Sequence, residues 1–144
     1  MHILLTNDDG IFTPSIAAMY KQLCKIATVT VVAPSQGQSG ASHSITLSPI
    51  TCDKIDITGK FTGYSVQGSP VDCIKLGILE LCPEPVDLVV SGALSVTSDR
   101  EHLERFLQWV NNWKPERKYQ LISMFAFLRR DYPSEGLWDI VGFE

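Results

Sequence analysis

The amino-acid sequence predicts an α/β fold built on a mostly parallel β-sheet. Over residues 1–92, segments patterned like strands alternate with segments patterned like amphipathic helices. The strand-like segments are continuous apolar runs, which is typical of strands buried on both faces of a parallel sheet. Turn-forming residues separate these segments along the chain. Together, these three observations favour a sheet layered with helices.

The first part of the chain predicts a strand, a helix and a second strand. Residues 2–6 are a short apolar run, and residues 7–10 (Asn-Asp-Asp-Gly) have the composition of a turn. Pro14 suits the first turn of a helix. That helix has apolar residues at helical spacing, at Ile16, Met19, Tyr20 and Leu23. Residues 28–33 are β-branched and apolar, so they predict a buried strand.

A loop and further strands are expected next. Residues 34–44 are rich in glycine and serine and predict a loop. Residues 45–57 read as short strands interrupted at Pro49 and at the polar pair 53–54. Residues 64–67 are a further candidate strand.

A second helix and a last strand complete this pattern. One helix face is traced by Val71, Ile74, Ile78 and Leu81. Pro83 and Pro85 end the helix. Residues 86–90 then predict another buried strand.

The composition changes at Gly92, which divides the chain into a predicted α/β core, residues 1–92, and a C-terminal segment, residues 93–144, expected to pack on it. All five arginines and all three tryptophans follow Gly92, whereas all four cysteines precede it.

We expect the C-terminal segment to be α-rich. Ser98 and Glu101 form a capping box before a helix. The apolar stripe of that helix is Leu103, Phe106, Leu107, Val110 and Trp113. Residues 119–128 are nearly all apolar, and periodicity leaves strand and helix both open.

Overall composition excludes several classes of protein. The 144 residues are 44% hydrophobic and 19% charged, as in globular proteins rather than disordered ones. The formal net charge of −4 disfavours a non-specific binder of nucleic-acid polymers, which needs a basic face. Apolar runs fall short of the roughly 20 residues of a membrane span. The first residues lack the pattern of a secretory signal, so we expect a cytoplasmic protein with no membrane partner.

The four cysteines predict neither a zinc site nor a disulfide framework. They contain no C-x-x-C pair, and we expect reduced, mostly buried thiols. Their positions are Cys24, Cys52, Cys73 and Cys82.

The acidic turn, residues 7–10, is the first candidate site. Ligands of open parallel sheets bind where the strands end at their carboxyl termini. Asp8 and Asp9 are adjacent there, and a hard divalent cation would remove their mutual repulsion. An ordinary Asx turn is the alternative, since the same four residues favour turns.

Two further segments are candidates for the same edge of the sheet. In the glycine-serine loop, residues 34–42, small residues let backbone N–H groups approach an anion, and a serine hydroxyl can complete a metal shell; a solvated loop is the alternative. Ala41 replaces the last glycine of a nucleophile elbow, which leaves that hydrolase motif unsupported. Residues 68–73 read as a helix N-terminus that either faces an anion or is simply well capped.

In this order, the three segments resemble the SurE-type family of metal-dependent nucleotidases (stationary-phase survival proteins). The matching stretches are MHILLTNDDGI, VVAPSQGQSGASHSITL, GSPVDCIKLGI and DLVVSG. The resemblance implies a Rossmann-like core and hydrolysis of nucleoside monophosphates with Mn²⁺ or Mg²⁺. It further implies that Asp8 and Asp9 are catalytic metal ligands and that Ser39 is a ligand from the loop. Asn7 and Gly40 are the expected phosphate-binding residues.

After Gly92 the chain departs from the family pattern. Leu94 stands where the family has an asparagine ligand, and a leucine side chain cannot bind a metal ion. We therefore expect weak activity at most, with a small-molecule nucleotide as substrate; a homodimer is an open alternative to a monomer. The competing hypothesis is a non-catalytic or chimeric module that binds metal or phosphate, or a protein partner. A receiver-type signalling domain is disfavoured because no lysine follows Val90 closely.

Overall fold

The structure, a computed structural model, describes residues 1–38, 46–92, 108, 112 and 121–123. Among these residues, six strands form one sheet in the order β3-β4-β2-β1-β5-β6. Neighbouring strands are parallel except for the antiparallel pair β3 and β4. This confirms the predicted α/β fold with a mostly parallel sheet. The strands are β1 (His2–Thr6), β2 (Thr28–Pro34), β3 (Cys52–Ile57), β4 (Phe61–Val66), β5 (Leu88–Ser91) and β6 (Leu121–Ser123).

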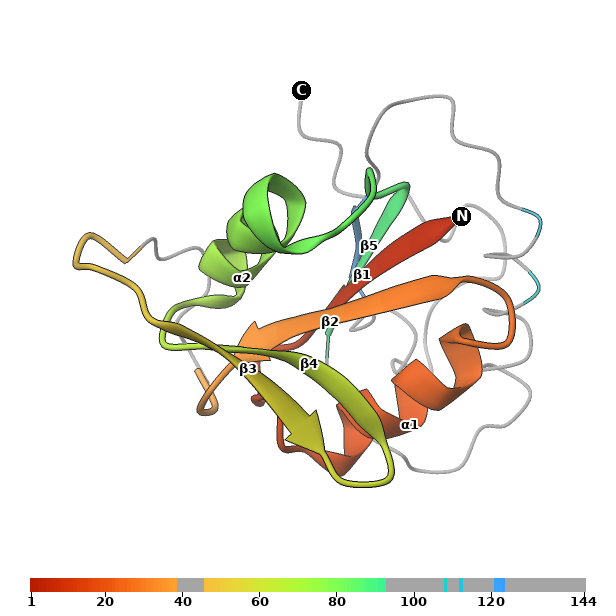
Figure 1. The fold of residues 1–144 in the computed structure, drawn as a ribbon, viewed down its shortest axis with the longest axis horizontal. Helices are drawn as coiled ribbons and strands as arrows, with labels where there is room; N and C mark the ends of the chain where they lie inside the picture. Colours follow the sequence, from red (N-terminus) through yellow and green to blue (C-terminus); the bar gives the residue numbers. More distant parts are fainter. Residues whose placement is uncertain (39–45, 93–107, 109–111, 113–120, 124–144) are drawn as a thin grey trace, which may run out of the picture.

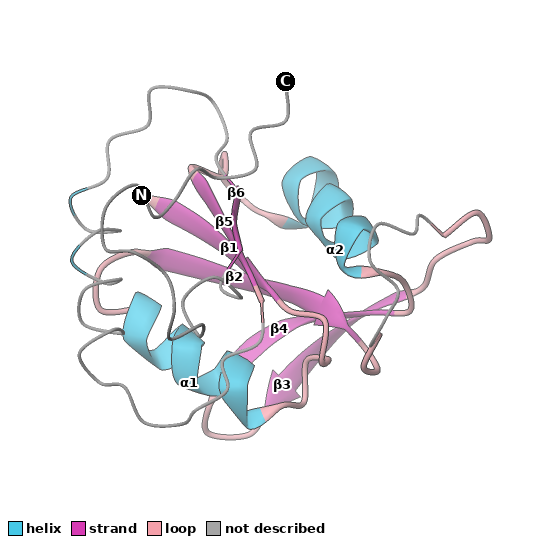
Figure 2. Ribbon diagram, turned by 180° about the vertical axis from the view of Figure 1, so that it is seen from behind, coloured by secondary structure: helices cyan, strands magenta, loops and turns pink. Residues whose placement is uncertain are grey.

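Two helical segments cover opposite faces of the sheet (Figures 1 and 2). Helix α1 (Pro14–Leu23) lies on one face. Helix α2 (Pro70–Leu76) lies on the other and continues into a π-helical turn (Gly77–Leu81). Both helices have proline in the first turn, as the sequence predicts.

The alternation of side chains along β1 explains this three-layer arrangement. Ile3 and Leu5 pack with the buried face of α1, whereas Leu4 packs with the cluster that includes Cys73 of α2. All three β1 side chains are fully or almost fully buried. A strand sandwiched between helices must be apolar at consecutive positions, which is why residues 2–6 lack the polar alternation of a half-exposed strand.

The structure corrects one strand prediction. Residues 45–57 were expected to form short strands broken at residues 53–54, but β3 runs unbroken from Cys52 to Ile57. Asp53, Lys54 and Asp56 are exposed. Charged side chains are tolerated there because β3 is the edge strand of the sheet.

Other boundaries differ from the predicted ones by a few residues. The strand expected over residues 64–67 is β4, which begins at Phe61, and the strand expected over residues 86–90 is β5, which spans Leu88–Ser91. The helix traced to Leu81 is α-helical only to Leu76. All four cysteines are free, but only Cys73 is buried: Cys52 and Cys82 are half-buried and Cys24 is exposed, so the expectation of mostly buried thiols is wrong.

Most predictions for the C-terminal segment fall outside the described residues, including the capping box at Ser98 and Glu101 and the apolar stripe of residues 103–113. Within that stretch, Gln108 and Asn112 lie off the stripe and are helical and exposed. For residues 119–128 the sequence leaves strand and helix both open. Residues 121–123 of that stretch form strand β6, which lies parallel to β5.

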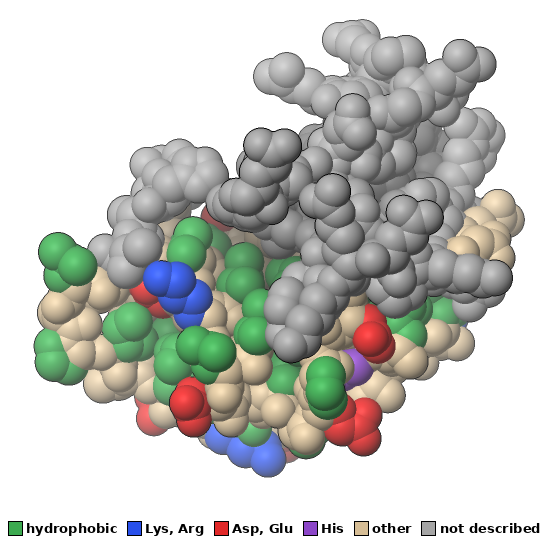
Figure 3. All heavy atoms as spheres, turned by 90° about the horizontal axis from the view of Figure 1, so that it is seen from above, with side chains coloured by type: hydrophobic (Ala, Val, Ile, Leu, Met, Phe, Trp, Pro, Cys, Tyr) green, Lys and Arg blue, Asp and Glu red, His purple; other side chains and the backbone are tan. Residues whose placement is uncertain are grey.

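The described surface carries scattered charges. On the face shown in Figure 3, acidic and basic side chains are interspersed with hydrophobic ones in the part of the chain that is coloured. Across residues 1–38 and 46–92, and the few described beyond them, no helix has the length and apolar character needed to cross a bilayer.

Candidate functional site

The acidic turn, residues 7–10, follows β1 at the carboxyl edge of the sheet and is held together by one buried side chain. Asn7 is fully buried. Its Nδ2 donates hydrogen bonds to the carbonyl oxygen of Gly10 (3.0 Å) and to Oγ1 of Thr13 (2.9 Å). Its Oδ1 accepts the backbone N–H of Gly10 at 3.1 Å. The turn that the sequence offered as the alternative to a metal site is therefore present, and it is compatible with one.

The side chain of Asn7 is fully engaged in this turn. Both of its amide hydrogens are used within it, so any contact of Asn7 with phosphate is left to its backbone. The expected phosphate contact of Asn7 stays a prediction. What the structure shows is a side chain that shapes the acidic turn on which Asp8 and Asp9 lie.

Asp8 and Asp9 differ in their environments. Asp9 is exposed, whereas Asp8 is partly buried and its Oδ1 atom is buried without a hydrogen-bond partner among the described residues. A buried carboxylate oxygen without a donor is unfavourable unless a cation or a water molecule meets it. This oxygen therefore fits a cation bound beside Asp8.

A second buried oxygen without a conventional partner, Oγ1 of Thr6, has a different explanation. It lies beside the thiol of Cys73, which is a weak hydrogen-bonding group. Burial raises the pKa of that thiol to about 12. Cys73 is thus protonated at neutral pH and suits neither nucleophilic catalysis nor metal binding.

The loop after β2 meets the acidic turn through its backbone. The N–H of Gln38 donates to the carbonyl oxygen of Asp8 at 2.7 Å, and the N–H of Ile11 donates to the carbonyl oxygen of Pro34 at 2.8 Å. A Cβ atom at Gly37 would lie 3.2 Å from the carbonyl oxygen of Asp9. The first part of the predicted glycine-serine loop therefore lies against the two acids.

Ser39 and Gly40, the loop residues expected to bind metal and phosphate, lie outside the described residues. Gln38 is the last described residue before them, and it contacts Asp8 directly. In the described ranges, no group of three or more His, Cys, Asp or Glu side chains could hold a metal ion. A cation at Asp8 would therefore need hydroxyl, amide or water oxygens as further ligands, which hard divalent cations accept.

The start of α2 is the third predicted segment, and the structure shows a capping arrangement there. Ser69 accepts the N–H of Asp72 (3.2 Å), and Asp72 accepts the N–H (2.8 Å) and hydroxyl (2.8 Å) of Ser69. Asp72 also accepts the N–H and hydroxyl of Thr46, at 3.2 and 2.6 Å. This favours the alternative of a well-capped helix over an anion site, because a carboxylate already occupies the helix N-terminus.

Burial and hydrogen bonding act in opposite directions on the pKa of Asp72. Burial by itself raises the pKa of its carboxyl, but the hydrogen bonds from Thr46 and Ser69 outweigh burial and lower the pKa below its ordinary value. Asp72 is thus ionised at neutral pH. It fixes Thr46, the first described residue after the glycine-serine loop, to the start of α2.

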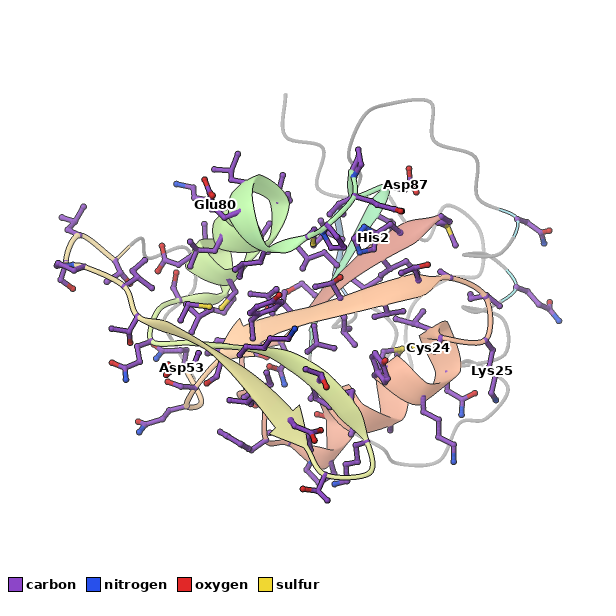
Figure 4. All side chains as sticks on the ribbon, viewed as in Figure 1. His2, Cys24, Lys25, Asp53, Glu80 and Asp87 are labelled. Atoms are coloured by element: carbon purple, nitrogen blue, oxygen red, sulfur yellow. The ribbon has the colours of Figure 1, made fainter. Side chains whose placement is uncertain are left out.

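The opposite end of the sheet, where the parallel strands begin, carries a histidine that the sequence analysis does not single out. His2 and Asp87 lie side by side there (Figure 4), with the N–H of His2 donating to Oδ2 of Asp87 at 2.7 Å. The ring Nδ1 of His2 is 3.0 Å from the carbonyl oxygen of Glu84, and Nε2 is 2.8 Å from Oγ1 of Thr30. A carbonyl only accepts, so Nδ1 carries the proton. This histidine links the start of β1 to β2 and to the segment that leads into β5, and it is remote from the acidic turn.

Comparison with known proteins agrees with this geometry. The family model for survival protein SurE matches residues 3–95. The chain is similar to the 5'-nucleotidase SurE of Syntrophus aciditrophicus (48% identity, 64% of this chain and 35% of that protein) and of Rhodopirellula baltica (50%, 64% and 37%). It is also similar to the crystal structure of SurE protein from Aquifex aeolicus, with a TM-score of 0.54 and 40% identity, covering 64% of this chain and 37% of that one.

The match thus spans little more than a third of each of these relatives, and it contains the acidic turn, the first residues of the glycine-serine loop and the start of α2. A family model that covers most of the chain, together with this fold and this arrangement of loops, identifies the family. The chain belongs to the survival protein SurE family.

Proposed function

We propose that this chain is a metal-dependent phosphomonoesterase that acts on nucleoside monophosphates. The single observation that carries the proposal is the buried Oδ1 of Asp8, which has no hydrogen-bond partner among the described residues and lies in a turn that contacts the glycine-serine loop. The relatives named 5'-nucleotidase SurE support the reaction class. The cation in the proposal is Mn²⁺ or Mg²⁺, with Asp8, Asp9 and Ser39 as its ligands.

In this proposal the residues of the chain have two roles, which are to hold the cation and to transfer a proton. When bound, the cation would polarise a phosphoryl oxygen and offset negative charge that develops in the reaction. Asp8 and Asp9 would hold it at the edge of the sheet, and one of the two carboxylates would accept a proton from the attacking water. The water oxygen bonds to phosphorus, the phosphorus–oxygen ester bond breaks, and the proton passes to the leaving alcohol. Backbone N–H groups at Asn7 and Gly40 bind the phosphate.

Turnover with a matched pair of variants tests the proposal. Wild type, Asp8→Asn and Asp56→Asn are compared with a nucleoside monophosphate and Mn²⁺. Asp56 is the control because it is exposed and lies away from the acidic turn. It pairs with Thr62 near the start of β4, whereas the acidic turn lies where the parallel strands end. We expect Asp8→Asn to abolish turnover and Asp56→Asn to leave it unchanged. Equal rates for wild type and Asp8→Asn would contradict the proposal.

Leu94 gives the proposal a second test. Loss of a positioned polar group typically lowers a rate by about 10²–10³-fold. We therefore expect low turnover from the natural chain and a clear increase from Leu94→Asn, with no change from Leu79→Asn, an exposed leucine on the π-helical turn.

The second candidate function is a module that binds metal or phosphate without turnover. The observation that favours it is the share of the relatives that the chain covers, 35–37%. Calorimetric titration with Mn²⁺ distinguishes the two functions: binding that requires Asp8, without any phosphate release even from Leu94→Asn, supports the second function.

A further inference from the structure

We infer that Phe12 is a specificity-determining residue that stacks on the base of the nucleotide substrate. This inference rests on the proposed function, since it assigns the base-binding side of the same site. The observation behind it is an exposed aromatic ring on the turn that follows the two acids. The side chain of Phe12 is 66% exposed, and Phe12 is the one aromatic residue among the exposed large hydrophobic residues that the structure describes.

The backbone around Phe12 is held on both sides. Residues 10–13 form a tight turn in which the N–H of Thr13 donates to the carbonyl oxygen of Gly10 at 3.2 Å. Ile11 is buried, and its N–H donates to the carbonyl oxygen of Pro34. Thr13 is tied further through its hydroxyl to Gly10 and Asn7. The neighbours of Phe12 are therefore fixed by the core while its own ring is left in solvent.

The placement of Phe12 matches the dimensions of a nucleotide. Two residues, Gly10 and Ile11, separate it from Asp9, so its Cα lies at most about 11 Å from that of Asp9, three steps of about 3.8 Å each. In a nucleoside monophosphate a single ribose separates phosphate from base, a span of similar length. A phosphate held at the acidic turn thus leaves the base within reach of the ring.

The apolar face of the Phe12 ring is better suited to contact with a nucleobase than to contact with water. A phenyl ring offers a flat apolar face and no hydrogen-bonding group, and bases stack favourably on such faces. Because the turn is already ordered, stacking would cost little conformational entropy. Isolated exposed hydrophobic residues are common on proteins, and the position beside the proposed phosphate site is what distinguishes this one.

A pair of ligands that differ only in the base tests the inference. Equilibrium binding and, where turnover occurs, KM are measured with Mn²⁺ for adenosine monophosphate and for ribose 5-phosphate, which lacks the base. We expect Phe12→Ala to weaken binding of adenosine monophosphate by at least about fivefold, the lower end for a stacked base, and to leave ribose 5-phosphate unchanged. Phe12→Tyr keeps the ring and should behave like wild type.

The control is Leu79→Ala, because Leu79 is 73% exposed on the π-helical turn and equally apolar. It should change neither ligand. The inference is overturned if Phe12→Ala affects both ligands equally, if it affects neither, or if wild type binds the two with the same affinity. Base-dependent binding without turnover would leave the inference standing while contradicting the proposed hydrolysis, so the two can fail separately.

Discussion

Asn7 shows how one buried amide can shape a site without taking part in its chemistry. Its three hydrogen bonds close the acidic turn and tie it to the start of α1. Each such bond contributes about 1 kcal/mol, and a buried group left without its partner costs more. The acids that follow Asn7 are thus held by a residue whose side chain is not free to bind a ligand.

Gly10 is the second residue on which the acidic turn depends. Its φ of +103° is a conformation that other residues rarely adopt, and a Cβ there would lie 3.3 Å from backbone atoms of Gln36 and Gly37. We expect Gly10→Ala to lower the free energy of unfolding by about 2–3 kcal/mol, through backbone strain and crowding together. Urea denaturation measures this change.

Gly59 provides the matched comparison. Its φ is +72°, but a Cβ there would meet nothing within 4 Å. Gly59→Ala should therefore cost only the strain, about 1 kcal/mol. Equal losses for the two variants would show that contact between the acidic turn and the loop after β2 is not a constraint on Gly10.

At the scale of elements, α2 is positioned by its ends. At its start, Asp72 caps the helix and binds Thr46, so the helix also anchors the segment that returns from the glycine-serine loop. At its end, a Cβ at Gly77 would lie 2.7 Å from a Cδ atom of Leu4, so glycine permits the close approach of the π-helical turn to β1.

The capping carboxylate should make stability depend on pH. A carboxyl whose pKa is lower in the folded state contributes stability that is fully present above its unfolded pKa, 3.8 for Asp72, and is lost as the pH falls through the folded pKa. We expect Asp72→Asn to lower the free energy of unfolding by about 1–3 kcal/mol at pH 7. The difference from wild type should shrink below pH 3.8.

Urea denaturation at several pH values measures this effect, with Asp56→Asn as the control for removal of an exposed carboxylate on β3. A difference between Asp72→Asn and wild type that stays constant down to the lowest pH would show that the charge of Asp72 contributes nothing.

At the scale of the whole molecule, the parallel sheet brings distant segments together at one edge. The acidic turn follows β1, and the loop after β2 contacts it through Gln38. The end of β5 joins the same edge, because Ser91 pairs with Thr6 and the N–H of Gly92 donates to the carbonyl oxygen of Thr6 at 3.3 Å. Gly92, the last described residue of the core, therefore lies at the same edge as the acidic turn.

Metal binding at this edge should stabilise the whole fold. A ligand that binds only the folded state adds about 2.7 kcal/mol at a concentration one hundred times its Kd. We expect Mn²⁺ to raise the Tm of wild type and of Asp56→Asn, but not that of Asp8→Asn. Buffer without divalent cations and with a chelator gives the baseline. A Tm increase that persists in Asp8→Asn would place the cation elsewhere.

The sequence by itself determined the α/β class, the strand at residues 2–6, the helix that begins at Pro14 and the family. Local periodicity and turn chemistry suffice for these, since a buried parallel strand must be apolar at consecutive positions. The unbroken course of β3 through residues 53–54 could not be foreseen, because only the tertiary structure makes it an edge strand with its charges in solvent.

For the candidate site, the sequence indicated which residues matter, and the tertiary structure decided what each can do. Asn7 and Asp8 are neighbours in the chain, yet folding uses every amide hydrogen of the first and leaves one carboxylate oxygen of the second buried without a donor. The hydrogen bonds of Asn7 are local, because their partners Gly10 and Thr13 lie three and six residues along the chain. The contact of Asp8 with Gln38 is not local: only the tertiary structure brings the loop after β2 against the acidic turn.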